Sequence, residues 1–130
     1  HAQGLDGHSD ADVVLHAICD ALLGAAGLGD IGEQYPNTDD QYKGISSSVL
    51  LKKTNQKVND LGFKVSNVDV IILAQEPKLQ NYKGKMRFHI AYELAVDEKQ
   101  VNIKAGTNEG LGFIGACEGI AAYAVVSLIK

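Results

Sequence analysis

Three residues with chemically useful side chains, Asp12, His16 and Asp20, recur at every fourth position of a segment that is otherwise almost entirely apolar. On a helix, this interval places the three side chains along one stripe. An imidazole on that stripe suits a metal ion, with the carboxylates orienting its ring or the neighbouring backbone. A core histidine satisfied by aspartates gives the same pattern. A catalytic zinc also needs about three protein ligands, and the stripe supplies one.

A polar pair, His8 and Ser9, comes directly before this segment. Unpaired backbone N–H groups and the helix dipole favour an anion at a helix N-terminus, so both residues are candidates for contacting a phosphate. Ser9 followed three positions later by Asp12 also resembles a capping box. The plain alternative is an N-cap without a ligand.

A glycine-rich stretch, Gly110–Gly115, matches the dinucleotide fingerprint G-x-G-x-x-G. The fingerprint needs an acidic residue ~20 positions further on, and the chain ends first, so we reject a dinucleotide site. Thr107, Asn108 and Glu109 come directly before these glycines, at the end of a predicted strand. A hydroxyl and a carboxylate there suit a phosphate and a divalent cation that bridges phosphates.

Several other polar residues have plain interpretations. Asp30 and Asp39 lie in a stretch rich in Pro, Asn, Thr and Asp, which predicts an exposed loop. They are suited to sugar hydroxyls, although loop aspartates also serve as turn formers. Lys78 and His89 are most simply surface residues, and Cys19 in its apolar segment is a core residue.

The elements that must position these residues alternate between helices and strands. Apolar spacing predicts helices over 9–26, 46–61 and 80–95, and β-branched runs predict strands over 63–74, 101–105 and 120–129. The first strand is almost continuously apolar after Asp69, which is typical of a strand covered on both faces. This order predicts one α/β domain, residues 1–130, with helices packed on one sheet.

Composition limits the function classes. The chain has 130 residues with 12 basic and 16 acidic side chains, so it has no cationic excess for nucleic acid or an anionic membrane. No apolar run reaches the ~20 residues of a membrane span. Cys19 and Cys117 make neither a disulfide framework nor a paired metal motif, which indicates a reducing compartment. We therefore expect a cytoplasmic protein.

Separated blocks of the sequence form one ordered pattern. They are His8–Asp12 with His16, Asp20–Ala26, Asp30–Gly32, Tyr35–Asp39, Asn67–Asp69, Ala74–Lys78, Val101–Ala105, Leu111–Phe113 and Glu118–Ala121. In this order they closely resemble the 2-C-methyl-D-erythritol 2,4-cyclodiphosphate synthase family of the non-mevalonate isoprenoid pathway. The resemblance covers essentially the whole chain.

The resemblance implies a homotrimer of α/β subunits, each with a mixed sheet and helices on one face, and active sites shared between neighbours. It implies conversion of 4-diphosphocytidyl-2-C-methyl-D-erythritol 2-phosphate to the cyclic diphosphate with release of CMP. Such intramolecular phosphoryl transfer between anions depends on positioning and charge neutralisation.

The resemblance also implies roles for individual residues. His16 would bind Zn²⁺, supported by Asp12 and Asp20, and Glu109 would bind Mg²⁺ or Mn²⁺. His8 and Thr107 match transition-state-stabilising positions. The remaining matches are substrate contacts: Ser9, Asp30, Ile31, Gly32, Tyr35, Asn37, Asp39, Ala74, Lys78, Leu79, Gln80, Ala105, Gly106, Asn108 and Phe113.

The chain departs from the family pattern in several places. The family's other two zinc ligands lie in an N-terminal G-x-D-x-H strand, which this sequence lacks, so we expect that strand to be missing. Gly106 and Asn108 replace threonines, Asn37 replaces an aspartate, and Ala116 replaces an arginine. These departures leave an alternative: a non-catalytic trimer that binds cytidine or isoprenoid diphosphates.

Overall fold

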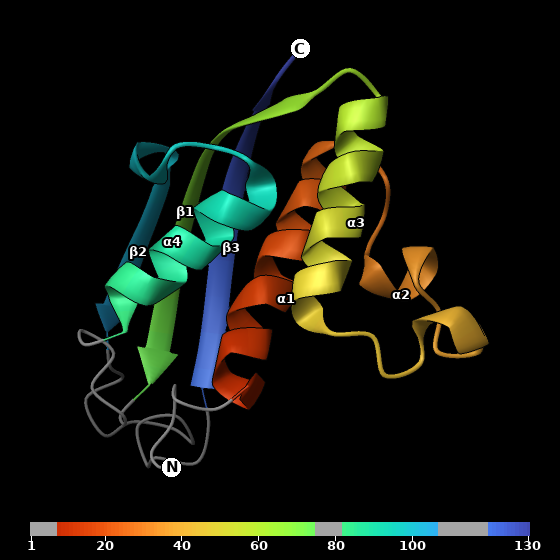
Figure 1. Ribbon diagram of the computed structural model, residues 1–130, viewed down its shortest axis with the longest axis horizontal. Coiled ribbons are helices and arrows are strands. Elements are labelled where there is room, and N and C mark those ends of the chain that lie inside the picture. The colour runs from red at the N-terminus through yellow and green to blue at the C-terminus, as the bar shows by residue number, and fades with distance from the viewer. Residues whose placement is uncertain (1–7, 75–81, 107–119) are drawn as a thin grey trace.

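The computed structural model describes residues 8–74, 82–106 and 120–130, with residues 8–10 described by their backbone only. Figure 1 shows helices lying against one side of a small sheet. In chain order the elements are α1 (His8–Ala25), α2 (Ile31–Gln34), the short 3-10 helix η2 (Asp40–Tyr42), α3 (Ser47–Asp60), β1 (Lys64–Ala74), α4 (Lys83–Leu94), the 3-10 helix η4 (Glu98–Gln100), β2 (Val101–Gly106) and β3 (Ile120–Ile129).

The sheet is mixed, with the strand order β2-β1-β3. Strand β1 runs parallel to β2 and antiparallel to β3. Helix α1 packs on β3 and α4 packs on β2, while α3 contacts both of these helices. The three long helices and three strands confirm the predicted elements and the predicted α/β class.

The expectation that β1 is covered on both faces is wrong. Val68, Val70 and Ile72 face the helices and are fully buried, whereas the alternate residues Ile71 and Leu73 are half-buried. Because the helices lie on one side only, alternate residues of the long apolar run point toward the helices and away from them. The sheet therefore has a covered face, which lies against the helices, and an open face on its other side.

The open face combines apolar and charged side chains. On β3, Tyr123, Val125 and Ile129 are 62%, 68% and 56% exposed. On the neighbouring strands, the Asp69 carboxylate accepts hydrogen bonds from Lys104 Nζ at 2.9 Å and Asn102 Nδ2 at 3.0 Å. These two bonds, first from Lys104 and then from Asn102, lower the pKa of Asp69.

The predicted capping box is also wrong. Helix α1 begins at His8, which places Ser9 inside its first turn and not before it. The Asp12 carboxylate, assigned to the box, instead accepts a hydrogen bond from Ser47 on α3. Among the described residues, we find no helix with the length and apolar character needed to cross a membrane.

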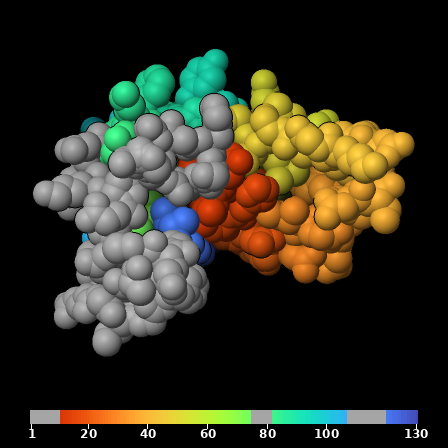
Figure 2. All heavy atoms as spheres, turned by 90° about the horizontal axis from the view of Figure 1, so that it is seen from below, coloured from red at the N-terminus to blue at the C-terminus, as the bar shows by residue number. Residues whose placement is uncertain are grey.

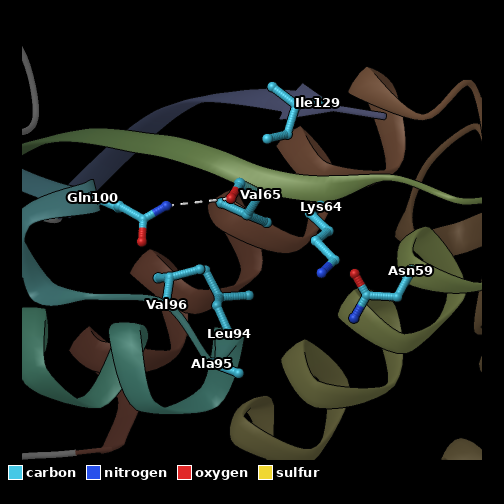
Figure 3. Close-up of a pocket in the computed structure, with 8 residues that line it drawn as sticks. All are labelled: Asn59, Lys64, Val65, Leu94, Ala95, Val96, Gln100 and Ile129. Atoms are coloured by element: carbon cyan, nitrogen blue, oxygen red, sulfur yellow. Dashed lines mark hydrogen bonds between the residues drawn. The ribbon is translucent and has the colours of Figure 1, made fainter.

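A cavity of about 530 Å³ opens where α3 and α4 end and β1 begins (Figure 3). Asn59, Lys64 and Leu94 are part of its wall. Gln100 also lines it, and its amide donates to the main-chain oxygens of Val65 and Ser66. None of the eight residues that line this cavity is a predicted site residue.

Candidate active site

The stripe predicted on the first helix is present on α1. Val14, Leu15 and Ile18 are buried in the core, while His16 and Asp20 are exposed. Since buried and exposed positions alternate with the helical repeat, the polar stripe stays accessible beside the core. Its imidazole is thus free to meet a ligand.

Cys19 on the same helix belongs to the core, as predicted. Its side chain is 0% exposed. Burial is the main cause that raises the pKa of its thiol to about 12. A thiol in this state is not a nucleophile near neutral pH, because the thiolate is the reactive form.

The ring of His16 is held by backbone and not by a carboxylate. Its Nδ1 lies 2.8 Å from the main-chain oxygen of Asp12. A carbonyl oxygen only accepts, so Nδ1 carries a proton, and in the neutral imidazole Nε2 then keeps its lone pair. This tautomer is the one that a metal-binding histidine needs when its ligand atom is Nε2.

The two carboxylates of the stripe hold neighbouring elements. Asp12 Oδ1 accepts a hydrogen bond from Ser47 Oγ at 2.6 Å, and Asp20 Oδ1 accepts one from the Ile31 main-chain N–H at 2.9 Å. The interpretation of His16 as a core histidine satisfied by aspartate carboxylates therefore does not fit. Asp12 joins α1 to α3, and Asp20 joins α1 to the start of α2.

The turn that leads into α2 is fixed by several constraints. Asp30 is the N-cap, and its carboxylate accepts from the Glu33 main-chain N–H at 2.9 Å. Gly29 has φ +83°, a left-handed backbone conformation that favours glycine over residues with a Cβ. Asp30 and Gly32 are exposed beside α1. The turn therefore presents backbone and carboxylate groups next to the His16 stripe.

The following segment is less open than predicted. Tyr35 is 5% exposed, and its hydroxyl lies 2.9 Å from Thr54 Oγ1 in the core. Burial raises the pKa of Tyr35. The Asp39 carboxylate accepts from the Gln41 main-chain N–H at 3.1 Å, which is the turn-forming role. Asn37 is exposed.

Strand ends complete the described part of the site. Ala74 is the last residue of β1, and Ala105 and Gly106 end the parallel strand β2, with Gly106 paired to Leu73. These carboxyl ends lie at the end of the sheet where α1 begins (Figure 1). Seen from that end in Figure 2, α1 lies between β3 and residues near α2. The ends of β1 and β2 and the start of the helix that carries His16 thus lie at the same end of the described fold.

Other candidate residues lie outside the described residues. They are Thr107, Asn108, Glu109 and Phe113 after β2, Ala116 in the same segment, and Lys78, Leu79 and Gln80 after β1; the side chains of His8 and Ser9 are outside as well. Within the described ranges, no group of three or more His, Cys, Asp or Glu side chains could hold a metal ion. His16 fits the role of one ligand, since its Nε2 is unengaged.

The environments of two polar residues, Ser47 and His89, were missed or misjudged from the sequence. Ser47 is 6% exposed and contacts Asp12 across the helix interface. His89, expected at the surface, is half-buried and its Nε2 lies 2.8 Å from Ser48 Oγ. The serine run 46–48 indicated a helix start, but nothing local to it indicated these partners.

Comparison with known proteins identifies the family. The YgbB family model matches residues 1–129. The 2-C-methyl-D-erythritol 2,4-cyclodiphosphate synthase of Alkaliphilus oremlandii is 53% identical over 130 residues, which is 100% of this chain and 83% of that protein. The bifunctional enzyme IspD/IspF of Campylobacter concisus is 54% identical over 125 residues, 96% of this chain and 34% of that protein.

Solved structures agree with this assignment. The bifunctional IspDF of Campylobacter jejuni has a TM-score of 0.86 at 50% identity, covering 93% of this chain and 33% of that one. A CDP-bound 2C-methyl-D-erythritol-2,4-cyclodiphosphate synthase has a TM-score of 0.84 at 32% identity, covering 95% and 79%. The chain therefore belongs to the YgbB family and is an enzyme that forms 2-C-methyl-D-erythritol 2,4-cyclodiphosphate in isoprenoid biosynthesis.

Proposed function

We propose that this chain forms the cyclodiphosphate by metal-assisted intramolecular phosphoryl transfer. The substrate is 4-diphosphocytidyl-2-C-methyl-D-erythritol 2-phosphate. An oxygen of its 2-phosphate bonds to the β-phosphorus, and the bond from that phosphorus to the oxygen retained by CMP breaks. The observation that carries the proposal is the state of His16 on α1: its side chain is exposed, its Nδ1 lies 2.8 Å from the Asp12 main-chain oxygen, and no hydrogen bond among the described residues engages its Nε2.

In this proposal, His16 is one ligand of Zn²⁺ and Glu109 binds Mg²⁺ or Mn²⁺. A zinc bound there would supply Lewis-acid polarisation of the reacting phosphate. The Asp12 carbonyl holds the imidazole in the tautomer that leaves Nε2 free. His8 and Thr107 stabilise the charge that develops in the transition state, and Ser9 makes a further phosphate contact.

The nucleotide half of the substrate lies across the α2 turn and the strand ends. Asp30 and Gly32 contact the ribose in this proposal. The bond from Ile31 to Asp20 and the Asp30 N-cap hold their turn beside α1. Ala74 and Ala105, with the segment 78–80, contact the cytosine. The existence of CDP complexes of related synthases supports this part of the proposal.

The other half of the substrate faces the segment 35–39 in this proposal. Asn37 and Asp39 lie toward the erythritol part. The ring of Tyr35 is buried in the core, so this residue anchors the segment and any substrate contact comes from its backbone. Ile31 and the residues Gly106, Asn108 and Phe113 complete the contacts.

We also propose that the active form is a cytoplasmic homotrimer with sites shared between subunits. The open face of the sheet supports the trimer, since Tyr123, Val125 and Ile129 form an exposed apolar row on one strand. Cys19, unpaired and buried, fits a reducing compartment.

The full-length protein tests the reaction. Incubated with the substrate and Mg²⁺, it should release CMP and yield the cyclic diphosphate, both followed by ³¹P NMR. His16→Ala should abolish turnover, whereas His89→Ala, which removes a histidine on α4 that contacts Ser48, should retain it. Unchanged turnover in His16→Ala would reject the zinc assignment. Calorimetric CDP binding with no CMP release and no stoichiometric zinc would favour the non-catalytic alternative.

A further inference from the structure

We propose that Ser47 is a positioning residue for His16, acting through Asp12. The inference rests on the proposed role of His16 as a metal ligand. It adds a residue from α3 that the sequence pattern on α1 does not contain. Ser47 lies 35 positions from Asp12 in the chain, so the contact exists only in the folded protein.

The contact has the features of a specific polar anchor. Ser47 is 6% exposed and is one of three buried polar residues among those described, with Thr54 and Asn55. A buried hydroxyl costs free energy unless it is hydrogen-bonded. Its Oγ donates to Asp12 Oδ1 at 2.6 Å, a distance typical of a charge-assisted O–H···O⁻ bond. The bond therefore fixes where the Asp12 carboxylate points.

Fixing that carboxylate matters for the imidazole one turn later. Side chains at positions i and i+4 of a helix are neighbours, so an unanchored Asp12 carboxylate reaches the ring of His16. There it would compete with the Asp12 main-chain oxygen for the Nδ1 proton, or draw the ring off its present direction. With the carboxylate held by Ser47, the carbonyl keeps the 2.8 Å bond to Nδ1, and the exposed ring keeps its present orientation.

The next residue provides a matched control. Ser48 is in the same turn of α3, and its Oγ makes a bond of similar length, 2.8 Å, to His89 on α4. The two serines thus have the same side chain and adjacent positions but anchor different helices. Only Ser47 connects to the helix of His16.

The test measures metal affinity and not turnover. Zn²⁺ is titrated into the full-length protein in competition with a chromophoric chelator, and the visible spectrum of the Co²⁺-loaded protein is recorded. Ser47→Ala should weaken Zn²⁺ binding by about 10–100-fold, the usual effect of removing a group that orients a ligand, and should change the Co²⁺ spectrum. Ser48→Ala should leave both readouts unchanged, and Ser47→Thr should restore most of the affinity because it keeps the hydroxyl.

The outcomes separate this proposal from the proposed function. If the wild-type protein binds Zn²⁺ and Ser47→Ala binds it as tightly as Ser48→Ala does, the positioning role is wrong and the zinc assignment stands. If the wild-type protein binds no Zn²⁺, the proposed function itself fails, and this role with it. Should Ser47→Ala not fold, Ser47→Cys gives the same comparison, because the thiol keeps the size but donates weakly.

Discussion

The covered and open faces of strand β1 differ in what lies against them, although they alternate along one continuous run of sequence. Val68, Val70 and Ile72 face the helices and have no exposed surface. Asp69 and Ile71, which lie between them in the chain, are half-buried. Local sequence made the strand apolar, but the placement of α1 and α4 on one side decided which residues are core.

The difference teaches that each face is stabilised in its own way. On the covered face, burial of apolar side chains supplies the free energy, and loss of a methyl group leaves a cavity. On the open face, Asp69, Lys104 and Asn102 form a hydrogen-bonded cluster next to Val125, which pairs with Asp69 in the register. An exposed apolar row beside such a cluster is the kind of surface that another subunit covers.

Two neighbouring isoleucines give the largest expected difference. Ile72→Ala should reduce the free energy of unfolding by about 2–5 kcal/mol, since the side chain is fully buried and a cavity remains. Ile71→Ala should cost clearly less in dilute protein, because that side chain is only half-buried. Urea titrations followed by circular dichroism measure both.

The same pair shows whether a partner covers the open face. If it does, the cost of Ile71→Ala should rise with protein concentration, because a bound subunit stabilises the folded state by mass action. The cost of Ile72→Ala should not change with concentration. If both variants lost the same free energy of unfolding in dilute protein, Ile71 would be as much a core residue as Ile72, and the two faces would not differ.

The charged cluster of the open face has a smaller effect with a defined pH dependence. Hydrogen bonds lower the pKa of Asp69 in the folded protein. The stabilisation it gives is therefore present above its unfolded pKa, near 4, and is lost as the pH falls through the folded pKa. Because Asp69 and Lys104 are 36% and 54% exposed, we expect less than about 1 kcal/mol at neutral pH.

Unfolding measured between neutral and acidic pH tests this expectation. Asp69→Asn should lower stability at neutral pH and flatten its decline at acidic pH. Asp40→Asn is the control, since Asp40 is 92% exposed and its nitrogen–oxygen distance to Lys43 is 3.7 Å. If the control variant changes the pH profile as much as Asp69→Asn does, the cluster has no special role.

The comparison also shows which features follow from sequence. The spacing of Asp12, His16 and Asp20 predicted a polar stripe because helical periodicity is local, and the structure contains it, with His16 and Asp20 exposed. The bond from Ser47 to Asp12 and the burial of Tyr35 against Thr54 were not predictable in this way. Each depends on how α3 packs against the preceding segments, and no short-range pattern encodes that packing.

Local sequence was also insufficient to predict how the turns around α2 and η2 pack against the rest of the fold. Gly32 and Asp30 were identified by resemblance to a family motif, and the structure adds why they lie beside α1: the Asp20 carboxylate accepts from Ile31. Polar residues in the segment 35–42 predicted a loop, yet the aromatic rings of Tyr35 and Tyr42 pack edge to face with centroids 5.1 Å apart. Two apolar rings in a polar stretch were the signal for burial.

The smallest effect on subunit stability should come from the exposed apolar row, and it gives the sharpest test of the open face. Val125→Lys should change the free energy of unfolding by no more than about 0.5 kcal/mol, because the side chain is 68% exposed. The same variant should abolish the proposed trimer, since a long cationic side chain would have to be desolvated at the subunit interface. Val49→Lys, on α3 and 45% exposed, introduces the same charge away from the sheet and should leave the assembly intact. Sedimentation velocity distinguishes the two, and a Val125→Lys protein that still sediments as a trimer would place the interface on another surface.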